Sequence, residues 1–263
     1  MTAVSPQSVC LPFAGPLVVA RFRRRFKRFC IEAEDENGIF VAHANNTGAM
    51  LGLLRPGLEA GFSVSDNPRR KLARTLEMVS LPDFRGPFWV GVNTLTPNRL
   101  FRLAVTQHAL PELADYDRLR PEPVFAHGRL DFLLSGPDGE CAVECKNVTM
   151  VEDGAAMFPD AATVRGCKHL VELTRRVRAG EGRAALFLLV QRPDGACFAP
   201  AAVIDPDYAA LLAEALAAGV LVLPYRARVD PTGIRLGERL PLAPCSQRPQ
   251  RAKSLFWRSA DGF

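Results

Sequence analysis

The sequence predicts an α/β protein (α+β overall) with two domains, a small N-terminal β-barrel and a larger C-terminal α/β domain. Three observations lead to this prediction. Short β-type segments separated by turn residues fill residues 16–85. Apolar strand segments then alternate with amphipathic helices over residues 86–241. With 263 residues, 48% of them apolar, the chain is long enough for two domains with separate cores.

The N-terminal part begins with residues 1–15, which are rich in proline, serine and small residues and are expected to form a flexible terminus. The first strand, from Leu17, returns after Glu36-Asn37-Gly38, whose Asn-Gly pair favours a hairpin turn. Further short strands are expected over residues 39–44 and 61–65. Strands of this length and spacing predict an OB-like barrel over residues 16–85.

The first strand pair of this barrel carries many cations, interleaved with Phe22, Phe26 and Phe29. Basic side chains follow phosphates and aromatic faces stack on unpaired bases, so the segment is a candidate nucleic-acid surface. In the alternative interpretation, the phenylalanines are core residues and the arginines are merely solvated. A net charge of +5 is compatible with a polyanionic partner but does not require one. The candidate cations here and in the loop at residues 66–71 are Arg21, Arg23, Arg24, Arg25, Lys27, Arg28, Arg69, Arg70 and Lys71.

The second domain, residues 86–241, opens with a predicted strand at residues 88–93 and a helix that begins near Asn98 and ends before Pro111. A later helix has Asp160 as its expected N-cap. Residues 184–190 are continuously apolar, as in a central strand that is buried on both sides. A helix from Asp205-Pro206 to Gly219 and a strand at 220–224 complete an α/β order with some parallel pairing. Residues 242–263 are expected to be a flexible tail.

Residues 128–147 predict an antiparallel hairpin around the turn Gly136-Pro137-Asp138-Gly139. A turn centred between Pro137 and Asp138 places Asp131 opposite Glu144 and Arg129 opposite Lys146. Because side chains alternate along a strand, these four charged residues are expected to share one surface. The opposite, apolar surface is expected to hold Leu130, Phe132, Leu134, Cys141, Val143 and Cys145.

Two opposed carboxylates destabilise a strand pair unless a cation lies between them. Oxygen ligands suit Mg²⁺ or Mn²⁺, so Asp131 and Glu144 are candidate metal ligands, with Glu122 as a third. With a metal ion held by these carboxylates, Lys146 is expected to orient or deprotonate an attacking water, or to hold a phosphate. The order Asp, hairpin, Glu-x-Lys is the signature of the PD-(D/E)xK nuclease fold, which makes Asp131, Glu144 and Lys146 the candidate catalytic residues. The alternative is a salt-bridged solvent face.

The helix after Asp160 places further cations beside this hairpin. Arg165, Lys168, His169 and Arg176 recur at spacings typical of one helix face, and a phosphate backbone is expected to run along that face. Solvated cations on an exposed face are the alternative. The opposite, apolar stripe is expected to comprise Val164, Cys167, Leu170, Val171, Leu173 and Val177.

The seven cysteines are an odd number without any C-x-x-C pair, which argues against a disulfide framework and a structural zinc site and fits a reducing cytoplasm. Cys141 and Cys145 are expected in the core. The chain has no apolar run of 18 residues and no segment that resembles a secretory signal at its start. The expected location is therefore the cytoplasm, without membrane association. The sequence does not define an oligomeric state.

Several blocks between about residues 17 and 242 resemble the SfsA family, named for sugar fermentation stimulation. The blocks are residues 25–29, 46–50, 92–94 with 97–98, 128–133, 143–149, 158–161 and 165–170. The resemblance implies an OB-like domain, a nuclease-like domain, DNA binding without strong sequence preference, and a regulatory role in sugar metabolism. It also implies that Asp131 and Glu144 are the metal carboxylates, Lys146 the lysine and Glu122 the upstream acid. Gly128, Cys145 and Asn147 depart from the family's usual residues without removing a metal ligand.

Two functions follow as hypotheses. The first is a sequence-nonspecific protein that binds DNA, or RNA, and hydrolyses phosphodiesters with Mg²⁺ or Mn²⁺. The alternative is a non-catalytic DNA-binding regulator of sugar (maltose) metabolism genes. Carbohydrate binding by the barrel is a third interpretation, which no aromatic platform beyond the phenylalanines supports.

Overall fold

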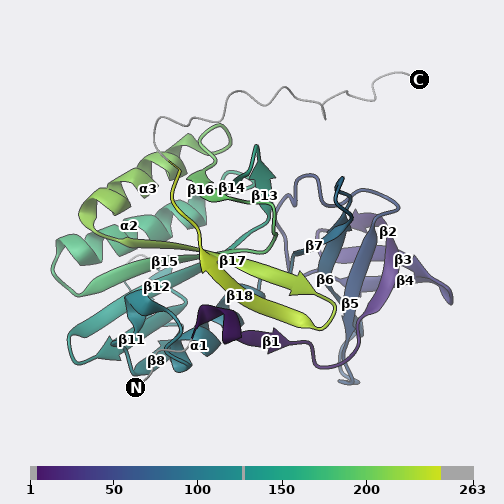
Figure 1. The fold of residues 1–263 in the computed structure, drawn as a ribbon, viewed down its shortest axis with the longest axis horizontal. Helices are drawn as coiled ribbons and strands as arrows, with labels where there is room; N and C mark the ends of the chain where they lie inside the picture. Colours follow the sequence, from purple (N-terminus) through teal and green to yellow (C-terminus); the bar gives the residue numbers. More distant parts are fainter. Residues whose placement is uncertain (1–4, 126–127, 244–263) are drawn as a thin grey trace.

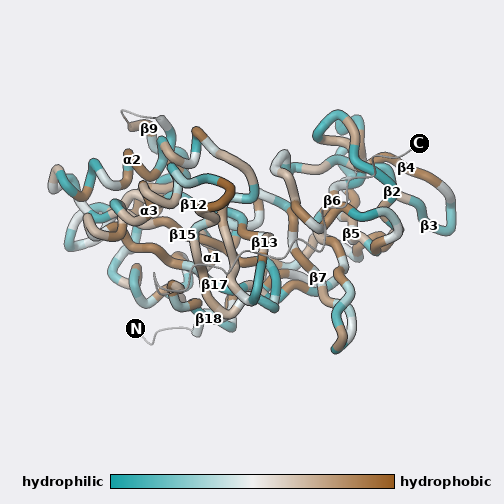
Figure 2. Tube along the Cα trace, turned by 90° about the horizontal axis from the view of Figure 1, so that it is seen from above, coloured by the Kyte–Doolittle hydropathy of each residue, from teal (hydrophilic) through white to brown (hydrophobic). Residues whose placement is uncertain are grey.

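The computed structural model describes residues 5–125 and 128–243 and confirms the predicted α/β class. A barrel of strands lies at one end of the molecule, and a larger sheet with helices on its faces lies at the other (Figure 1). The loops at the outer end of the barrel, on the right in Figure 2, are largely hydrophilic. No helix within the described ranges has both the length and the apolar character needed to cross a membrane.

The barrel is formed by a six-stranded sheet in the order β4-β3-β2-β5-β6-β7. Its strands are β2 (Val18–Phe26), β3 (Cys30–Asp35), β4 (Gly38–His43), β5 (Glu59–Val64), β6 (Arg74–Leu81) and β7 (Phe88–Gly91). A parallel pairing of His43 in β4 with Thr75 in β6 closes five of these strands into a barrel, which confirms the OB-like prediction. Phe22 is buried in the barrel core, whereas Phe29 is 49% exposed and stacks on His43. The core interpretation therefore holds for Phe22 but not for Phe29.

Strand β7 belongs to the barrel and not to the second domain. It pairs with β6 in the register Val79 with Val90, and Val90 and Val92 are fully buried among barrel residues. The predicted boundary at residue 85 is therefore too early, and the structure places it after Val92. The sequence misplaces it because Asp83, Arg85 and Gly86 resemble an interdomain linker but form the turn of a β6–β7 hairpin.

The second domain is built on a seven-stranded sheet in the order β1-β18-β17-β15-β12-β11-β8. Its strands are β1 (Cys10–Pro12), β8 (Arg118–Pro121), β11 (Phe132–Gly136), β12 (Gly139–Val148), β15 (Arg183–Val190), β17 (Leu221–Asp230) and β18 (Gly233–Arg239). Strands β12, β15 and β17 are parallel, and the outer strands are antiparallel. Helix α1 (Thr96–Thr106) covers one face, while α2 (Val164–Arg178) and α3 (Pro206–Ala218) cover the other. Residues 184–190 of the central strand β15 are apolar and buried, as expected for a strand with both faces covered.

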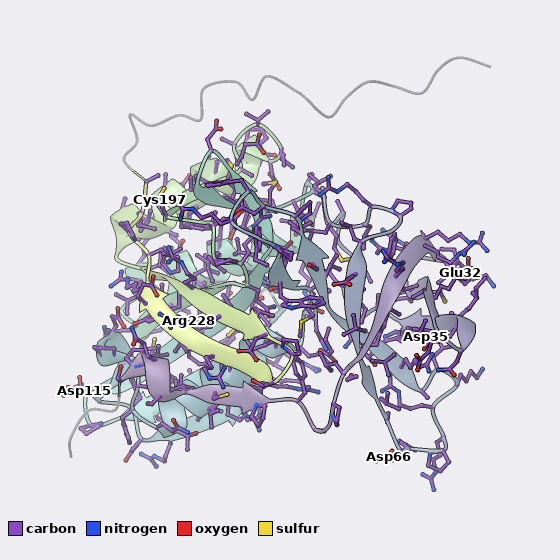
Figure 3. All side chains as sticks on the ribbon, turned by 45° about the vertical axis from the view of Figure 1, so that its right-hand side comes forward. Glu32, Asp35, Asp66, Asp115, Cys197 and Arg228 are labelled. Carbon is purple, nitrogen blue, oxygen red and sulfur yellow. The ribbon has the colours of Figure 1, made fainter. Side chains whose placement is uncertain are left out.

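Smaller elements surround this sheet. A three-stranded sheet comprises β13 (Met150–Glu152), β14 (Ala155–Phe158) and β16 (Cys197–Pro200), and a short pair comprises β9 (Val124–Phe125) and β10 (Gly128–Arg129). Two single turns of 3-10 helix are η1 (Pro6–Ser8) and η2 (Pro111–Leu113). Figure 3 shows the side chains of both domains. Of the labelled residues, Glu32, Asp35 and Asp66 lie on the barrel, and Asp115, Cys197 and Arg228 lie on the second domain.

The N-terminal segment is part of the second domain, so the expectation of a flexible terminus is wrong for residues 5–12. Strand β1 pairs with β18, and Val9 is fully buried in the core under α1. At the other end, Leu242 forms a bridge with Phe198 and the N–H of Ala243 donates to the Phe198 carbonyl. The remainder of the predicted tail, residues 244–263, lies outside the described residues, as do residues 1–4.

Val9→Ala is expected to lower the free energy of unfolding by about 2 kcal/mol, because it removes two buried carbons and leaves a cavity. Urea denaturation followed by circular dichroism measures this change. Val203→Ala is the matched control, since Val203 is 91% exposed and the same truncation there should cost little. Equal free-energy changes for the two variants would contradict the packing of the N-terminal segment.

The hairpin of β11 and β12 has the predicted register, with Leu133 opposite Ala142 and Ser135 opposite Glu140. Its two faces differ from the prediction. Leu130, Leu133 and Ala142 are buried in the core beneath α2 and α3, so the face expected to be charged is largely apolar as well. Leu130 packs on that face and not with Phe132. Cys141 and Cys145 are buried as expected, and burial raises the pKa of the Cys141 thiol to about 12.

Candidate metal centre

Glu144 and Lys146 lie in the second half of β12, with their side chains directed toward α2. The Lys146 Nζ is 2.5 Å from Oε1 of Glu144, and Nδ1 of His169 on α2 contacts the same oxygen. Lys146 Nζ is also 3.1 Å from His169 Nδ1. Glu144 is only 3% exposed and His169 only 5%. The structure thus brings the predicted glutamate and lysine together, and adds a histidine to them.

Asp131 lies just before β11 and reaches the backbone of β12. Its Oδ2 accepts a hydrogen bond from the N–H of Cys145 at 2.8 Å, and its Oδ1 accepts one from Asn98 Nδ2 of α1 at 2.7 Å. The charge of Glu144 also acts on Asp131, so the two carboxylates are close enough to interact. Asp131 lies just outside the paired residues of the hairpin, whose register ends at Phe132 and Val143.

The two carboxyl groups of the centre have pKa values shifted in opposite directions. Burial raises the pKa of Asp131, and the neighbouring charge of Glu144 raises it further. Burial also acts to raise the pKa of Glu144, but the nearby Lys146 and His169 outweigh it and hold that pKa below its usual value. Lys146 and His169 therefore favour the ionised form of Glu144, and a further positive charge between the two carboxyl groups would favour the ionised form of Asp131 as well.

One oxygen of this pair has no partner. Glu144 Oε2 is buried and forms no hydrogen bond with any described residue. A buried carboxylate oxygen without a partner is costly, and a divalent cation would satisfy it. Two neighbouring carboxylates supply the hard oxygen atoms that Mg²⁺, Mn²⁺ and Ca²⁺ prefer. The residues present therefore fit a divalent cation.

The structure does not bring Glu122, the predicted third carboxylate, together with Asp131 and Glu144. Within residues 5–125 and 128–243, no group of three or more His, Cys, Asp or Glu side chains is placed to hold a metal. The N–H of Glu122 donates to the Asp131 carbonyl, but its exposed side chain forms a 3.0 Å ion pair with Arg129. Glu122 has a φ of 51°, a turn conformation that the flanking prolines did not reveal. Arg129 thus pairs with Glu122 and not with the centre.

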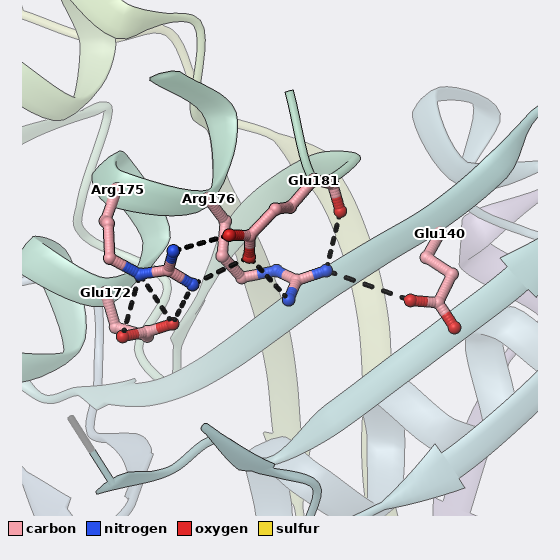
Figure 4. A network of polar contacts seen from close by, with 5 residues as sticks. All are labelled: Glu140, Glu172, Arg175, Arg176 and Glu181. Carbon is pink, nitrogen blue, oxygen red and sulfur yellow. Dashed lines mark hydrogen bonds and ion pairs between the residues drawn. The ribbon is translucent and has the colours of Figure 1, made fainter. Parts of the chain in front are cut away.

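Helix α2 presents only part of its predicted basic face to solvent. Arg165 and Lys168 are exposed, but His169 belongs to the buried centre. Arg176 is buried as well, within ion pairs to Glu181 and Glu140 that continue through Arg175 to Glu172 (Figure 4). Two residues of the predicted apolar stripe are exposed instead, Val164 at 75% and Val171 at 40%. His169 and Arg176 are buried where they contact Glu144 and Glu140 of β12, contacts that the helix periodicity alone does not reveal.

Most of the predicted cations of the first barrel strand have partners within the chain. Arg23 pairs with Glu32 and Glu34, and Arg24 pairs with Glu32. Arg25 donates to the carbonyls of Arg28, Asn46 and Gly48, and burial lowers its pKa. Two more cations have polar partners, since Arg21 donates to the Gly57 carbonyl and Arg70 to the Thr75 hydroxyl.

Four of the predicted barrel cations are exposed, and their side chains form neither a hydrogen bond nor an ion pair with any described residue. We call them the free barrel cations: Lys27, Arg28, Arg69 and Lys71. Lys27 and Arg28 form the turn between β2 and β3, with φ values of 48° and 59°. Arg69 and Lys71 lie on the loop between β5 and β6, which also carries Asp66 and projects from the edge of the barrel (Figure 3).

Sequence reasoning missed residues that join the elements around the centre. Asn98, expected only as the start of α1, holds Asp131. Asp160, expected as a helix cap, instead accepts the N–H of Met50 at 2.8 Å and so joins the barrel to the second domain, while Thr163 caps α2. Gln191 adds another junction, because its carbonyl accepts the N–H of Gly91. Met50 and Asp160 each lie in one of the sequence blocks that resemble the family, but nothing in the sequence indicates that these two residues contact each other.

A closed OB barrel followed by a mixed sheet with helices on both faces defines a two-domain protein of the α/β class. Comparison with protein families agrees with this division. Residues 24–92 match the SfsA N-terminal OB domain, and residues 95–233 match the sugar fermentation stimulation protein RE domain. The chain belongs to the SfsA family. The two matches meet close to the boundary after Val92 that the strand pairing shows.

Individual relatives match along most of the chain. A sugar fermentation stimulation protein homolog of Syntrophobacter fumaroxidans is 54% identical over 239 residues, which cover 90% of each chain. A homolog of Geobacter sulfurreducens is 47% identical over 86% of this chain and 96% of its own. Among solved structures, that of Pyrococcus furiosus SfsA in complex with Ca²⁺ matches with a TM-score of 0.81 and 28% identity, over 89% of this chain and 98% of that chain.

Proposed function

We propose that the protein binds DNA without sequence preference and hydrolyses phosphodiesters with the help of Mg²⁺ or Mn²⁺. The observation that carries this proposal is the buried, unpartnered Oε2 of Glu144 next to Asp131 and Lys146. The related Pyrococcus furiosus protein forms a complex with Ca²⁺, another divalent cation that prefers oxygen ligands.

The chain's own groups have separate tasks in this proposal. Asp131 and Glu144 would hold the cation, which, when bound, supplies polarisation of a phosphate and activation of water. Lys146, whose side chain is 15% exposed, provides a cationic donor that can hold a water or a phosphate oxygen. Asn98 and the Cys145 N–H keep Asp131 in place beside Glu144.

Binding of the nucleic acid would depend on the free barrel cations and on Arg165 and Lys168 of α2. Contacts between such side chains and phosphates carry no sequence information, and the affinity they provide falls steeply with salt. This is the basis for proposing binding without sequence preference. RNA offers the same phosphates, so it is included in the test.

A second candidate is a non-catalytic DNA-binding regulator of sugar (maltose) metabolism genes. The observation that favours it is the burial of the centre, because Glu144 and His169 are almost completely enclosed. In that case the cluster of Glu144, Lys146 and His169 has a structural role, and the cations alone account for binding.

Incubation with single- and double-stranded DNA and RNA, in Mg²⁺, Mn²⁺ or EDTA, distinguishes these candidates. We expect cleavage in Mg²⁺ or Mn²⁺ and none in EDTA. Asp131→Asn should lose this cleavage, whereas Asp115→Asn, the same change at an exposed position, should keep it. Binding without cleavage under every metal condition would instead support the regulator.

A further inference from the structure

Hydrogen-bond donors are distributed unequally over the four carboxylate oxygens of the candidate centre. Asp131 Oδ1 accepts from Asn98 and Asp131 Oδ2 from the Cys145 N–H. Glu144 Oε1 is contacted by both Lys146 and His169. Glu144 Oε2, although buried, has no partner in the described part of the chain. Three oxygens are therefore held by the protein, and one is left for something else.

The surroundings of His169 determine which ring nitrogen faces Glu144 as a donor. Arg165 Nε donates to His169 Nε2 at 3.4 Å, and an arginine cannot accept a hydrogen bond. The ionised carboxylate oxygen that Nδ1 contacts can only accept, so in a neutral imidazole the proton is on Nδ1 and Nε2 is the acceptor. Lys146 Nζ, which lies 3.1 Å from the same Nδ1, then donates to Glu144 Oε1 and not to the ring. His169 thus donates to one defined oxygen of the carboxylate.

The helix that carries His169 is itself anchored at its start. The Thr163 side chain accepts a hydrogen bond from the Gly166 N–H at 3.0 Å, and the Thr163 N–H donates to Asp205 at 2.8 Å. A histidine on a capped, packed helix keeps its position more firmly than a lysine on a flexible four-carbon chain. Lys146 is also the residue proposed to contact a water or phosphate, and when it does so His169 remains as the donor on Oε1.

We propose that His169 is a positioning residue that fixes Glu144 through Oε1, so that Oε2 is the oxygen presented to the divalent cation. This inference rests on the proposed metal centre. Residues behind a metal ligand that orient it typically change metal affinity by about 10- to 100-fold when they are removed. His169 was expected from the sequence to contact phosphate, but with only 5% of its surface exposed it has little access to one.

Direct binding of Mn²⁺ to the full chain, followed by the electron paramagnetic resonance signal of the free ion, tests the inference without measuring activity. His169→Leu replaces the imidazole by an apolar side chain of similar size that has no hydrogen-bond donor. We expect it to weaken Mn²⁺ binding by about 10- to 100-fold. His169→Asn places an amide N–H where Nδ1 lies, and we expect it to retain most of the affinity. Val171→Ala, a change at a partly exposed position of the same helix, should bind Mn²⁺ like the unmodified chain.

The Glu144→Gln variant separates failure of this inference from failure of the metal centre. If Glu144→Gln binds Mn²⁺ as tightly as the unmodified chain, the centre itself is wrong. If Glu144→Gln loses Mn²⁺ while His169→Leu keeps it, only the role of His169 is wrong. A crystal structure of the unmodified chain with Mn²⁺ decides the point even if His169→Leu fails to fold. A metal on Oε1, or on His169 itself, would overturn the inference.

Discussion

Glu144→Gln is expected to reduce the rate of metal-dependent phosphodiester cleavage by about a thousandfold or more, since a bound cation contributes several kcal/mol of transition-state stabilisation. Glutamine has nearly the same shape, but it removes the charge that faces Asp131 and Lys146. One of its terminal atoms becomes an amide nitrogen, which cannot ligate Mg²⁺. The measurement is the initial rate of cleavage of a labelled DNA in saturating Mg²⁺ or Mn²⁺.

Glu140→Gln is the matched control for this prediction. Glu140 lies on the same strand, four residues earlier, with a half-exposed side chain that forms a 3.8 Å ion pair with Arg176. Its substitution should leave the cleavage rate close to that of the unmodified chain. Circular dichroism must show that Glu144→Gln is folded, because the change leaves a buried lysine without its carboxylate. A folded Glu144→Gln that cleaves at the normal rate would exclude the proposed centre.

The heart of the candidate centre is predictable because it is local in sequence. Asp131, Glu144 and Lys146 lie within 16 residues and are joined by a turn whose residues define the register. Once the register is known, the period of two determines which side chains are neighbours. The pairs of Arg23 and Arg24 with Glu32 and Glu34 are less predictable, because the register of β2 and β3 shifts at an irregularity between Phe22 and Arg24.

The rest of the centre depends on tertiary contacts that no local pattern contains. His169 and Asn98 come from helices on opposite faces of the sheet and meet the carboxylates only after the sheet is covered. The burial of Arg176 follows from Glu140 and Glu181, which lie before and after its helix. The pairing of β1 with β18 joins the two ends of the domain, so the composition of residues 5–12 gave no indication of it.

The junction between the two domains relates the barrel to the centre. Arg25 holds the carbonyls of Asn46 and Gly48, and Met50 in the same loop donates to Asp160. Asp160 lies just before α2, the helix that carries Arg165, Lys168 and His169. Arg25, which was predicted to contact nucleic acid, therefore helps to fix the position of the barrel relative to α2, the helix beside the metal centre. The proposed contacts with phosphates are therefore those of the free barrel cations and of Arg165 and Lys168.

Substitution of all four free barrel cations, Lys27, Arg28, Arg69 and Lys71, by glutamine is expected to weaken DNA binding by at least about tenfold at low salt. Each cation lost from contact with duplex phosphate should lower the slope of log affinity against log salt by about one. These side chains have no carboxylate partners among the described residues, so they are available to phosphates. The measurement is a titration of labelled duplex DNA, followed by fluorescence anisotropy in EDTA at several salt concentrations.

The variant Arg23→Gln/Arg24→Gln provides the control on the same barrel. It also removes positive charge, but from arginines that are already paired with Glu32 and Glu34. A smaller change of the salt slope per charge removed is therefore expected, because a paired arginine displaces fewer counterions when DNA binds. If both variants lower the slope equally per charge, binding depends on the overall charge of the barrel and not on the free barrel cations. If neither lowers it, the DNA lies along α2 alone, and Arg165→Gln/Lys168→Gln becomes the variant that should abolish binding.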